Sequence, residues 1–265
     1  MPAEKYRDLS IGLELFSVRE DFEQNPEKTF KKISTIGYNG VEFFGNQFRL
    51  FSPERIRKAL DDNRLECYGY LASWADMQLD TYKDILDYNK VIGNNKIAIG
   101  SAPVSMLSNR KDLKKVIEHL NIMYGIAKNE GYMFGYHNHS TDFTMIDGVT
   151  AWDRIFENTP QDFLMVLDTG NALDGGAFSI PILKKFPNRS PWIHIKPFDT
   201  GIYGYLTMIG EDSFDWPSLI ETCVETGGAK ILTIEFGHRY HYTPFFGVEL
   251  CLKRLKLELT REVKS

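Results

Sequence analysis

The sequence predicts a (β/α)8 barrel, the TIM-barrel architecture of the α/β class. Eight short apolar runs alternate with eight amphipathic segments along the 265 residues. A series of this kind fills a barrel of about 250 residues. The rival architecture, a doubly wound open sheet, usually carries a glycine-rich loop after its first strand, and no GxGxxG or Walker loop occurs here. No long linker interrupts the series, so residues 1–265 are expected to form a single domain.

The apolar runs have the length and composition of buried strands, because they are short and rich in β-branched and aromatic residues. Strands are predicted at residues 11–15, 40–44, 65–71, 96–99, 132–137, 163–167, 192–195 and 230–234.

Each run is followed by a segment whose apolar residues recur at helical spacing. Pro26 and Pro53 stand where the first turn of a helix tolerates proline. Helices are predicted at residues 26–36, from 53 onward, and at 80–92, 110–129, 148–157, 180–186, 216–226 and 247–259.

Charge and composition exclude several classes of protein. The 31 basic and 36 acidic residues give a net charge of −5 without any basic block, which disfavours nucleic-acid binding. Cys67, Cys223 and Cys251 share no close spacing, which disfavours a disulfide scaffold and a thiolate zinc site. No signal-peptide pattern opens the chain, and no apolar stretch approaches the roughly 20 residues that cross a bilayer. The expectation is a cytoplasmic protein without a membrane partner.

Polar side chains end several of the predicted strands, where barrels of this type carry their chemistry. The strand ends are occupied, in order, by Glu14, Glu42, Tyr70, Ile99, His137, Asp168, His194 and Glu235. The last four are metal-capable, and each lies about one strand–helix unit from the next. A set of two histidines and two carboxylates suits Mn²⁺, Co²⁺, Zn²⁺, Ni²⁺ or Fe²⁺ better than Ca²⁺.

A purely structural explanation exists for each of these residues. His137 could be a core histidine bonded to the backbone, and Asp168 could simply cap the next turn. Glu235 follows an apolar strand, where an unpaired carboxylate would be costly. Four such strand ends in succession favour a shared site.

Two further residues extend this site. His139 lies two positions beyond His137, so both side chains share one face of the strand. Lys196 stands in the same relation to His194 and could neutralise an alkoxide or enediolate. A rim lysine that reaches toward solvent is the alternative.

Seven motifs resemble the xylose isomerase-like, sugar phosphate isomerase/epimerase family of TIM barrels, and they follow one another in the family's order. They are Gly-Leu-Glu-Leu-Phe-Ser-Val-Arg at 12–19, Gly-Tyr-Asn-Gly-Val-Glu at 37–42, Tyr-His-Asn-His at 136–139, Leu-Asp-Thr-Gly-Asn-Ala at 167–172, His-Ile-Lys at 194–196, Gly-Glu-Asp-Ser-Phe-Asp-Trp at 210–216 and Thr-Ile-Glu at 233–235.

The resemblance implies one divalent cation at the barrel mouth, Mn²⁺ first, with Co²⁺, Zn²⁺, Ni²⁺, Fe²⁺ or Mg²⁺ as alternatives. Asp168, His194 and Glu235 match the family's ligand positions. The better-known epimerases carry a glutamate on the fifth strand that acts as both ligand and base. Here His137 holds that place, as in a branch of the family whose motif is His-Asn-His.

This difference affects the expected proton transfers. Glu235 is expected to act as ligand and base, with His139 or Asp142 as the second proton carrier and Lys196 beside them. The expected function is a metal-dependent sugar isomerase or epimerase that removes a proton next to a carbonyl through an enediolate. A dehydratase or lyase acting on a keto-sugar or keto-glycoside is the alternative, and the missing glutamate favours it slightly.

Two alternatives belong to other classes of protein. A non-catalytic sugar-binding barrel would need none of this chemistry. An abasic-site endonuclease, which shares the barrel, is disfavoured because the chain has only six histidines and no basic surface.

A small carbohydrate is the expected partner, with Glu42, Trp74 and Phe16 as substrate-binding residues. The two aromatic rings could stack on a sugar face, although core packing also explains them. No phosphate cradle is evident near the last two strands. The aromatic stretch at 240–246 could support a homo-oligomer or cover the barrel mouth.

Overall fold

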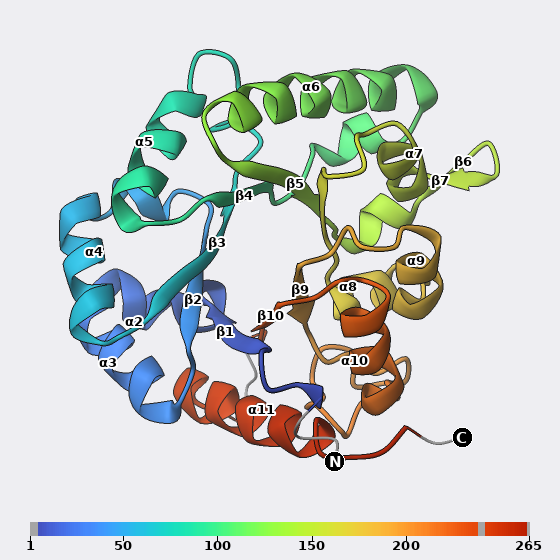
Figure 1. Ribbon diagram of the computed structural model, residues 1–265. Helices are drawn as coiled ribbons and strands as arrows, with labels where there is room; N and C mark the ends of the chain where they lie inside the picture. The colour runs from blue at the N-terminus through green and yellow to red at the C-terminus, as the bar shows by residue number, and fades with distance from the viewer. Residues whose placement is uncertain (1–4, 238–241, 264–265) are drawn as a thin grey trace.

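The chain forms a nearly closed barrel of eight parallel strands with helices around it (Figure 1), which confirms the predicted fold class. The structure is a computed structural model that describes residues 5–237 and 242–263. Neighbouring strands follow the order β8-β5-β4-β3-β2-β1-β10-β9.

Every barrel strand begins and ends within one residue of its predicted boundary. The strands are β1 (Ser10–Glu14), β2 (Gly40–Phe44), β3 (Glu66–Ala72), β4 (Lys96–Ile99), β5 (Met133–His137), β8 (Leu164–Val166), β9 (Trp192–Ile195) and β10 (Ile231–Ile234).

The helices return the chain from one strand to the next. Asn25 and Ser52 accept backbone N–H groups at the start of their helices, each just before a proline in the first turn. The helices are α2 (Arg19–Gln24), α3 (Pro26–Ile36), α4 (Pro53–Asp62), α5 (Tyr82–Ile92), α6 (Arg110–Asn129), α7 (Ala151–Glu157), α8 (Thr169–Asp174), α9 (Ser179–Lys185), α10 (Trp216–Glu225) and α11 (Pro244–Glu258).

Several helix predictions need correction, and the helix expected from residue 247 begins at Pro244. The helix expected from residue 148 begins at Ala151, because a hairpin of β6 (Met145–Ile146) and β7 (Val149–Thr150) precedes it. Asp147 and Gly148 form its turn with positive φ angles of 47° and 77°, as an Asp-Gly hairpin turn requires. The short helices α2 and α8 were not predicted, since neither is long enough to show a helical period.

The barrel closes between β8 and β9. His194 N donates to Leu167 O at 2.9 Å, and Asp168 and His194 form an isolated parallel bridge. Two of the predicted metal ligands therefore lie at the seam where the ring of strands closes.

The barrel interior is packed with side chains. Trp192 of β9 is fully buried and belongs to an apolar cluster separate from the main core. A Cβ atom at Gly69 of β3 would lie 2.3 Å from the indole, so glycine makes room for this ring. Among the described residues, no helix is long and apolar enough to span a bilayer.

Candidate metal centre

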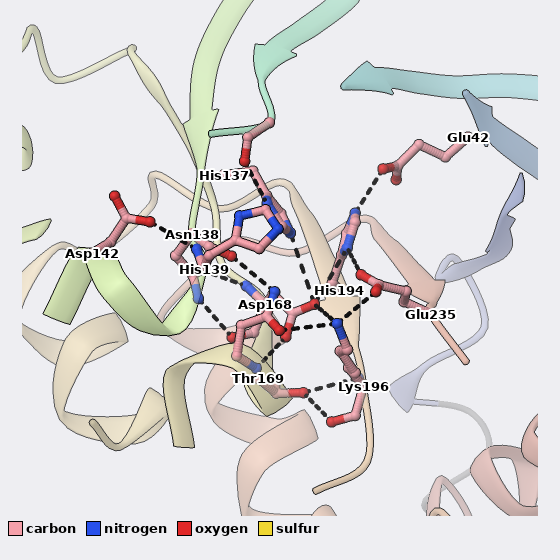
Figure 2. A network of polar contacts seen from close by, with 12 residues as sticks. Glu42, His137, Asn138, His139, Asp142, Asp168, Thr169, His194, Lys196 and Glu235 are labelled. Atoms are coloured by element: carbon pink, nitrogen blue, oxygen red, sulfur yellow. Dashed lines mark hydrogen bonds and ion pairs between the residues drawn. The ribbon is translucent and has the colours of Figure 1, made fainter. Parts of the chain in front are cut away.

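Four side chains converge at the carboxyl ends of β5, β8, β9 and β10 (Figure 2). One ligand atom from each of His137, Asp168, His194 and Glu235 lies within 4.8 Å of the others, and all four residues are buried. These are the four residues predicted from the strand ends, although no two of them are close in sequence.

Two buried atoms of this cluster make no hydrogen bond among the described residues, although Asp168 Oδ2 lies 3.6 Å from His194 Nδ1 and 3.9 Å from Lys196 Nζ. His137 Nδ1 lies 3.1 Å from the Gly100 carbonyl, to which it donates, and this leaves a lone pair on Nε2. His137 Nε2 and Asp168 Oδ2 are 3.8 Å apart, and neither has a hydrogen-bond partner among the described residues. Unpaired buried polar atoms are costly. A divalent cation would satisfy both, so the residues present fit such an ion.

Asp168 uses its two oxygens differently. Oδ1 accepts the backbone N–H of Asn171 at 2.6 Å and caps α8. The Asn138 side chain accepts from Asp168 N at 2.7 Å and donates to Asp168 O at 3.1 Å, which holds the backbone in place. Capping and metal binding are therefore compatible, because Oδ2 remains free of the cap.

His194 is oriented by a carboxylate behind it. Its Nε2 lies 2.7 Å from Glu42 Oε1, while Glu42 Oε2 accepts from Trp192 Nε1 at 2.6 Å. Nδ1 is thereby turned toward Glu235 Oε2 at 3.2 Å. Burial lowers the pKa of His194, but Glu42 and the other carboxylates outweigh burial, so the pKa lies well above its usual value. The surroundings of Nδ1 thus favour positive charge.

The predicted substrate contact of Glu42 needs correction. Glu42 is fully buried and does not line the cavity at the barrel mouth. Its carboxylate fixes the ring of His194 in the way that carboxylates commonly support metal-binding histidines.

Lys196 points inward rather than toward solvent. Its Nζ donates to Glu235 Oε1 at 2.5 Å and to Asn171 Oδ1 at 2.9 Å, and its side chain is 12% exposed. Burial lowers the pKa of Lys196, but Glu235 and Asp168 outweigh burial and raise it above the usual value. Burial raises the pKa of Glu235, but Lys196 and His194 outweigh it and lower that pKa well below its usual value. The two side chains form a buried ion pair.

A cavity of about 490 Å³ lies at the barrel mouth, and His137, Lys196 and Glu235 reach its wall. Its lining is Glu14, Phe16, Phe44, Gly45, Leu71, Ala72, Ser73, Gly100, Ser101, His137, His139, Ser140, Asn171, Lys196, Tyr205 and Glu235. The wall contains apolar side chains such as Phe16, Phe44 and Leu71, and polar ones such as His139, Asn171 and Glu235.

Of the two proton carriers considered, His139 alone lines this cavity. Partial desolvation by the surrounding protein and neighbouring His137 lower the pKa of His139 to about 4, so the imidazole is neutral at neutral pH. Asp142 lies behind it, fully buried, and accepts from His139 N at 2.8 Å and from Tyr136 Oη at 2.7 Å. Asp142 therefore supports the His139 backbone and does not face the cavity.

The two predicted aromatic contacts differ in outcome. Phe16 lines the cavity and packs edge-on against Phe44, with ring centroids 5.3 Å apart. Trp74 does not line the cavity, because its ring packs against His119 at a centroid distance of 4.6 Å. The predicted aromatic contact at 240–246 lies partly outside the described residues.

A comparison with known protein families agrees with this geometry. The xylose isomerase-like TIM barrel model matches residues 30–250. The chain belongs to this family. This match confirms the resemblance to the family that the sequence motifs predicted.

The individual relatives compared with this xylose isomerase-like barrel share little of its sequence. The chain is 28% identical over 193 residues to the inosose dehydratase of Clostridium perfringens (strain 13 / Type A). That match covers 64% of this chain and 63% of the relative, so it spans less than two thirds of the relative's length.

Two solved structures share the fold. A sugar phosphate isomerase/epimerase from Parabacteroides distasonis ATCC 8503 superposes with a TM-score of 0.81 at 22% identity, covering 97% of this chain and 96% of that one. The IOLI protein with a bound zinc atom superposes with a TM-score of 0.73 at 13% identity, covering 97% of this chain and 100% of that one. At these identities the likeness is one of fold.

Glu14, Asn171 and Tyr205 are among the cavity residues of this xylose isomerase-like barrel that were not predicted as site residues. Glu14 had a signal in the sequence, since it ends the first predicted strand. Asn171 belongs to the motif at 167–172 but was given no role, and Tyr205 had no signal because it lies in the connection after β9.

Proposed function

We propose that this xylose isomerase-like barrel is a divalent-metal-dependent sugar isomerase or epimerase that removes a proton beside a carbonyl. The observation that carries the proposal is a pair of buried atoms, His137 Nε2 and Asp168 Oδ2, that make no hydrogen bond among the described residues and belong to a four-residue cluster at the cavity. Buried orphan atoms in a cleft are a sign of a functional site.

The ion would be held by His137, Asp168, His194 and Glu235. Mn²⁺ is the expected ion, with Co²⁺, Zn²⁺, Ni²⁺, Fe²⁺ or Mg²⁺ as alternatives. When bound, a divalent cation supplies Lewis-acid polarisation of a substrate carbonyl and stabilises the enediolate. The likeness to a structure with bound zinc supports a divalent ion.

The chain's own residues would move the proton. His139 faces the cavity as a neutral imidazole, so its free nitrogen is able to accept a proton from the carbon next to the carbonyl. The Glu235 carboxylate is the other base within the cavity wall. Lys196 carries a positive charge and is able to donate a hydrogen bond to the oxygen on which negative charge develops.

The substrate is proposed to be a keto-sugar or a keto-cyclitol. Phe16 and Phe44 offer apolar rings for the carbon face of such a molecule. The cavity's described lining has one cationic side chain, Lys196, and Glu235 already pairs with it. A phosphate group would therefore find no free cation in this wall.

Dehydration is the second candidate, with the same first step. Loss of a hydroxyl from the carbon beyond the enediolate would follow proton abstraction, with the hydroxyl leaving as water after protonation. Two observations favour it: His137 stands where better-known epimerases hold a second glutamate, and the chain is similar to an inosose dehydratase.

The test is solvent deuterium exchange followed by proton NMR. Protein reconstituted with Mn²⁺ would be incubated in D₂O with D-fructose, D-tagatose and scyllo-inosose. Deuterium entering beside the carbonyl is expected. A new stereoisomer or aldose identifies isomerisation or epimerisation, and an unsaturated ketone that absorbs in the ultraviolet identifies dehydration.

Three variants define the result. Asp168→Ala is expected to lose both the metal, measured by elemental mass spectrometry, and the exchange. His139→Ala is expected to keep the metal and lose about 10²- to 10⁴-fold in exchange rate. The exposed Asp80→Ala serves as the matched control. Wild-type protein that takes up no divalent metal, or that exchanges no proton, would leave a non-catalytic sugar-binding barrel as the better explanation.

A further inference from the structure

Glu14 lines the cavity, and one oxygen of its carboxyl group has no hydrogen-bond partner among the described residues. It ends β1, is 4% exposed and contributes to the cavity wall. Its Oε2 atom is buried and has no hydrogen-bond partner among the described residues.

The register of the barrel explains its position. Glu14 lies directly opposite Glu42 on β2, and on the other side Leu13 lies opposite Ile234 of β10. Glu14 therefore stands between Glu42 and Glu235, in the layer of side chains that carries the cluster.

The two flanking glutamates are fully engaged and Glu14 is not. Glu42 uses both oxygens, on Trp192 and His194. Glu235 also uses both, on Lys196 and His194. An unpaired buried acceptor carries an energetic cost. The position of Glu14 beside the cavity gives this cost an explanation.

We propose that Glu14 is a substrate-positioning residue whose Oε2 accepts a hydrogen bond from a substrate hydroxyl. A carboxyl oxygen accepts such a bond whether or not the group is ionised, so the inference does not depend on its titration. It rests on the proposed function and extends it. Glu14 would fix the rotation of the polyol in the cavity and so decide which carbon faces His139.

A specificity follows from this role. A site that hydrogen-bonds a hydroxyl discriminates strongly against the analogue that lacks it. One deoxy position of the sugar should therefore matter more than the others, and its effect should vanish when Glu14 is replaced.

The experiment compares Glu14→Leu and Glu14→Gln with Glu42→Gln in Mn²⁺-loaded protein. Metal content and melting temperature would be measured first. Calorimetric binding of D-fructose, myo-inositol and the 1-, 3- and 4-deoxyfructoses would follow, with kcat and KM for any turned-over ketose. We expect Glu14→Leu to keep the metal, to melt at the wild-type temperature or above, and to weaken polyol binding or raise KM at least tenfold.

The pattern of losses separates positioning from structure. Glu14→Gln, which keeps an acceptor, should recover part of the affinity, and Glu14→Leu should bind one deoxyfructose as well as wild type does. Glu42→Gln should lose metal instead. Unchanged polyol affinity in Glu14→Leu, or a loss of metal or melting temperature like that of Glu42→Gln, would overturn the inference.

Failure of the proposed function gives a different result. Because calorimetric binding needs no turnover, a protein that binds polyols without exchanging a proton still decides the role of Glu14 through Glu14→Leu. A wild-type protein that binds none of these polyols overturns the positioning role as well.

Discussion

Trp192 and His194 lie two residues apart on β9, and both donate to the carboxylate of Glu42. The period of the strand turns both side chains toward the barrel axis. At the scale of single residues, the geometry of the candidate metal centre therefore depends on a glutamate that neither lines the cavity nor belongs to the four candidate ligands. The role of each carboxylate at this end of the barrel depends on which groups its two oxygens contact.

Glu42→Gln tests this dependence. Glutamine offers one acceptor oxygen where Glu42 serves two donors, and its amide NH₂ group donates, so it would no longer hold the His194 ring in the tautomer that leaves Nδ1 free. We expect the affinity for Mn²⁺ to fall about 10- to 100-fold, as is usual when such a supporting group is lost. Competition with a chelating dye measures this, with the exposed Glu23→Gln as control. Equal affinities in the two variants would contradict the role of Glu42.

Asp212 predicts a pH dependence of stability. Its Oδ1 accepts from Trp216 Nε1 at 2.8 Å, and its Oδ2 is buried without a partner among the described residues. Burial raises the pKa of this carboxyl to about 7. Because the folded state binds a proton that the unfolded state has lost, the free energy of unfolding falls as the pH rises from about 4 to about 7.

Asp212→Asn keeps the acceptor and removes the ionisation. We expect the variant to exceed wild type by at least about 1 kcal/mol at pH 8, since one pKa unit corresponds to about 1.4 kcal/mol. The difference should shrink at pH 5. Urea unfolding at both pH values measures it, with Asp80→Asn as control. A difference that is the same at both pH values would show that Asp212 is not the titrating group.

At the scale of elements, the two sides of the barrel are fitted to one another. Gly69 of β3 faces the indole of Trp192 from β9, and the register between β2 and β3 shifts between Val41 and Glu42. The missing side chain on one strand accommodates the large one from across the barrel. Since Trp192 also donates to Glu42, this packing sits directly below the candidate metal centre.

Gly69→Ala should therefore be costly. Its Cβ would lie 2.3 Å from the indole, so the ring or a strand must shift, and overpacking of this kind costs about 1–3 kcal/mol. The matched control is Gly125→Ala in α6, where the new methyl group meets nothing within 4 Å. That change should stabilise the protein by about 0.5–1 kcal/mol. Urea unfolding of both variants checks the opposite signs, and two changes of the same sign would contradict the packing argument.

At the scale of the whole molecule, the candidate metal centre lies across the seam of the barrel. His137 at the end of β5 and Asp168 just after β8 lie on one side, and His194 in β9 and Glu235 just after β10 lie on the other. The ladder between β8 and β9 is reduced to an isolated bridge at Asp168 and His194. A bound ion would link the two edges of the sheet where their pairing is shortest.

Removal of the metal should lower the thermal stability. An ion present at 100 times its Kd stabilises the folded state by about 2.7 kcal/mol. For a chain of this size each kcal/mol shifts Tm by about 2–4 °C, so chelation should lower Tm by about 5–10 °C. Differential scanning calorimetry with and without EDTA measures the shift. Asp168→Ala should show none, and an equal shift in that variant would place the effect of EDTA elsewhere.

Much of this molecule can be predicted from its sequence, because the buried residues of strands and helices recur at regular spacings along the chain. All barrel strands were located within one residue, since each is an apolar run bounded by turn signals. The predicted cluster of His137, Asp168, His194 and Glu235 follows from the same pattern, because parallel strands bring their carboxyl ends together. Binding of an ion at this cluster stays a prediction.

Only the tertiary structure decided what each side chain near the centre touches. Glu42 and Trp74 were expected at the substrate, but Glu42 bonds His194 and Trp74 packs on His119. In the sequence Glu14 is one strand end among several, and only the fold shows that it lines the cavity and that its Oε2 atom lacks a hydrogen-bond partner among the described residues. A sequence shows which face of a strand a residue occupies. The partner that it meets there comes from another strand, up to 152 residues away for Glu42 and His194, and depends on how the barrel closes.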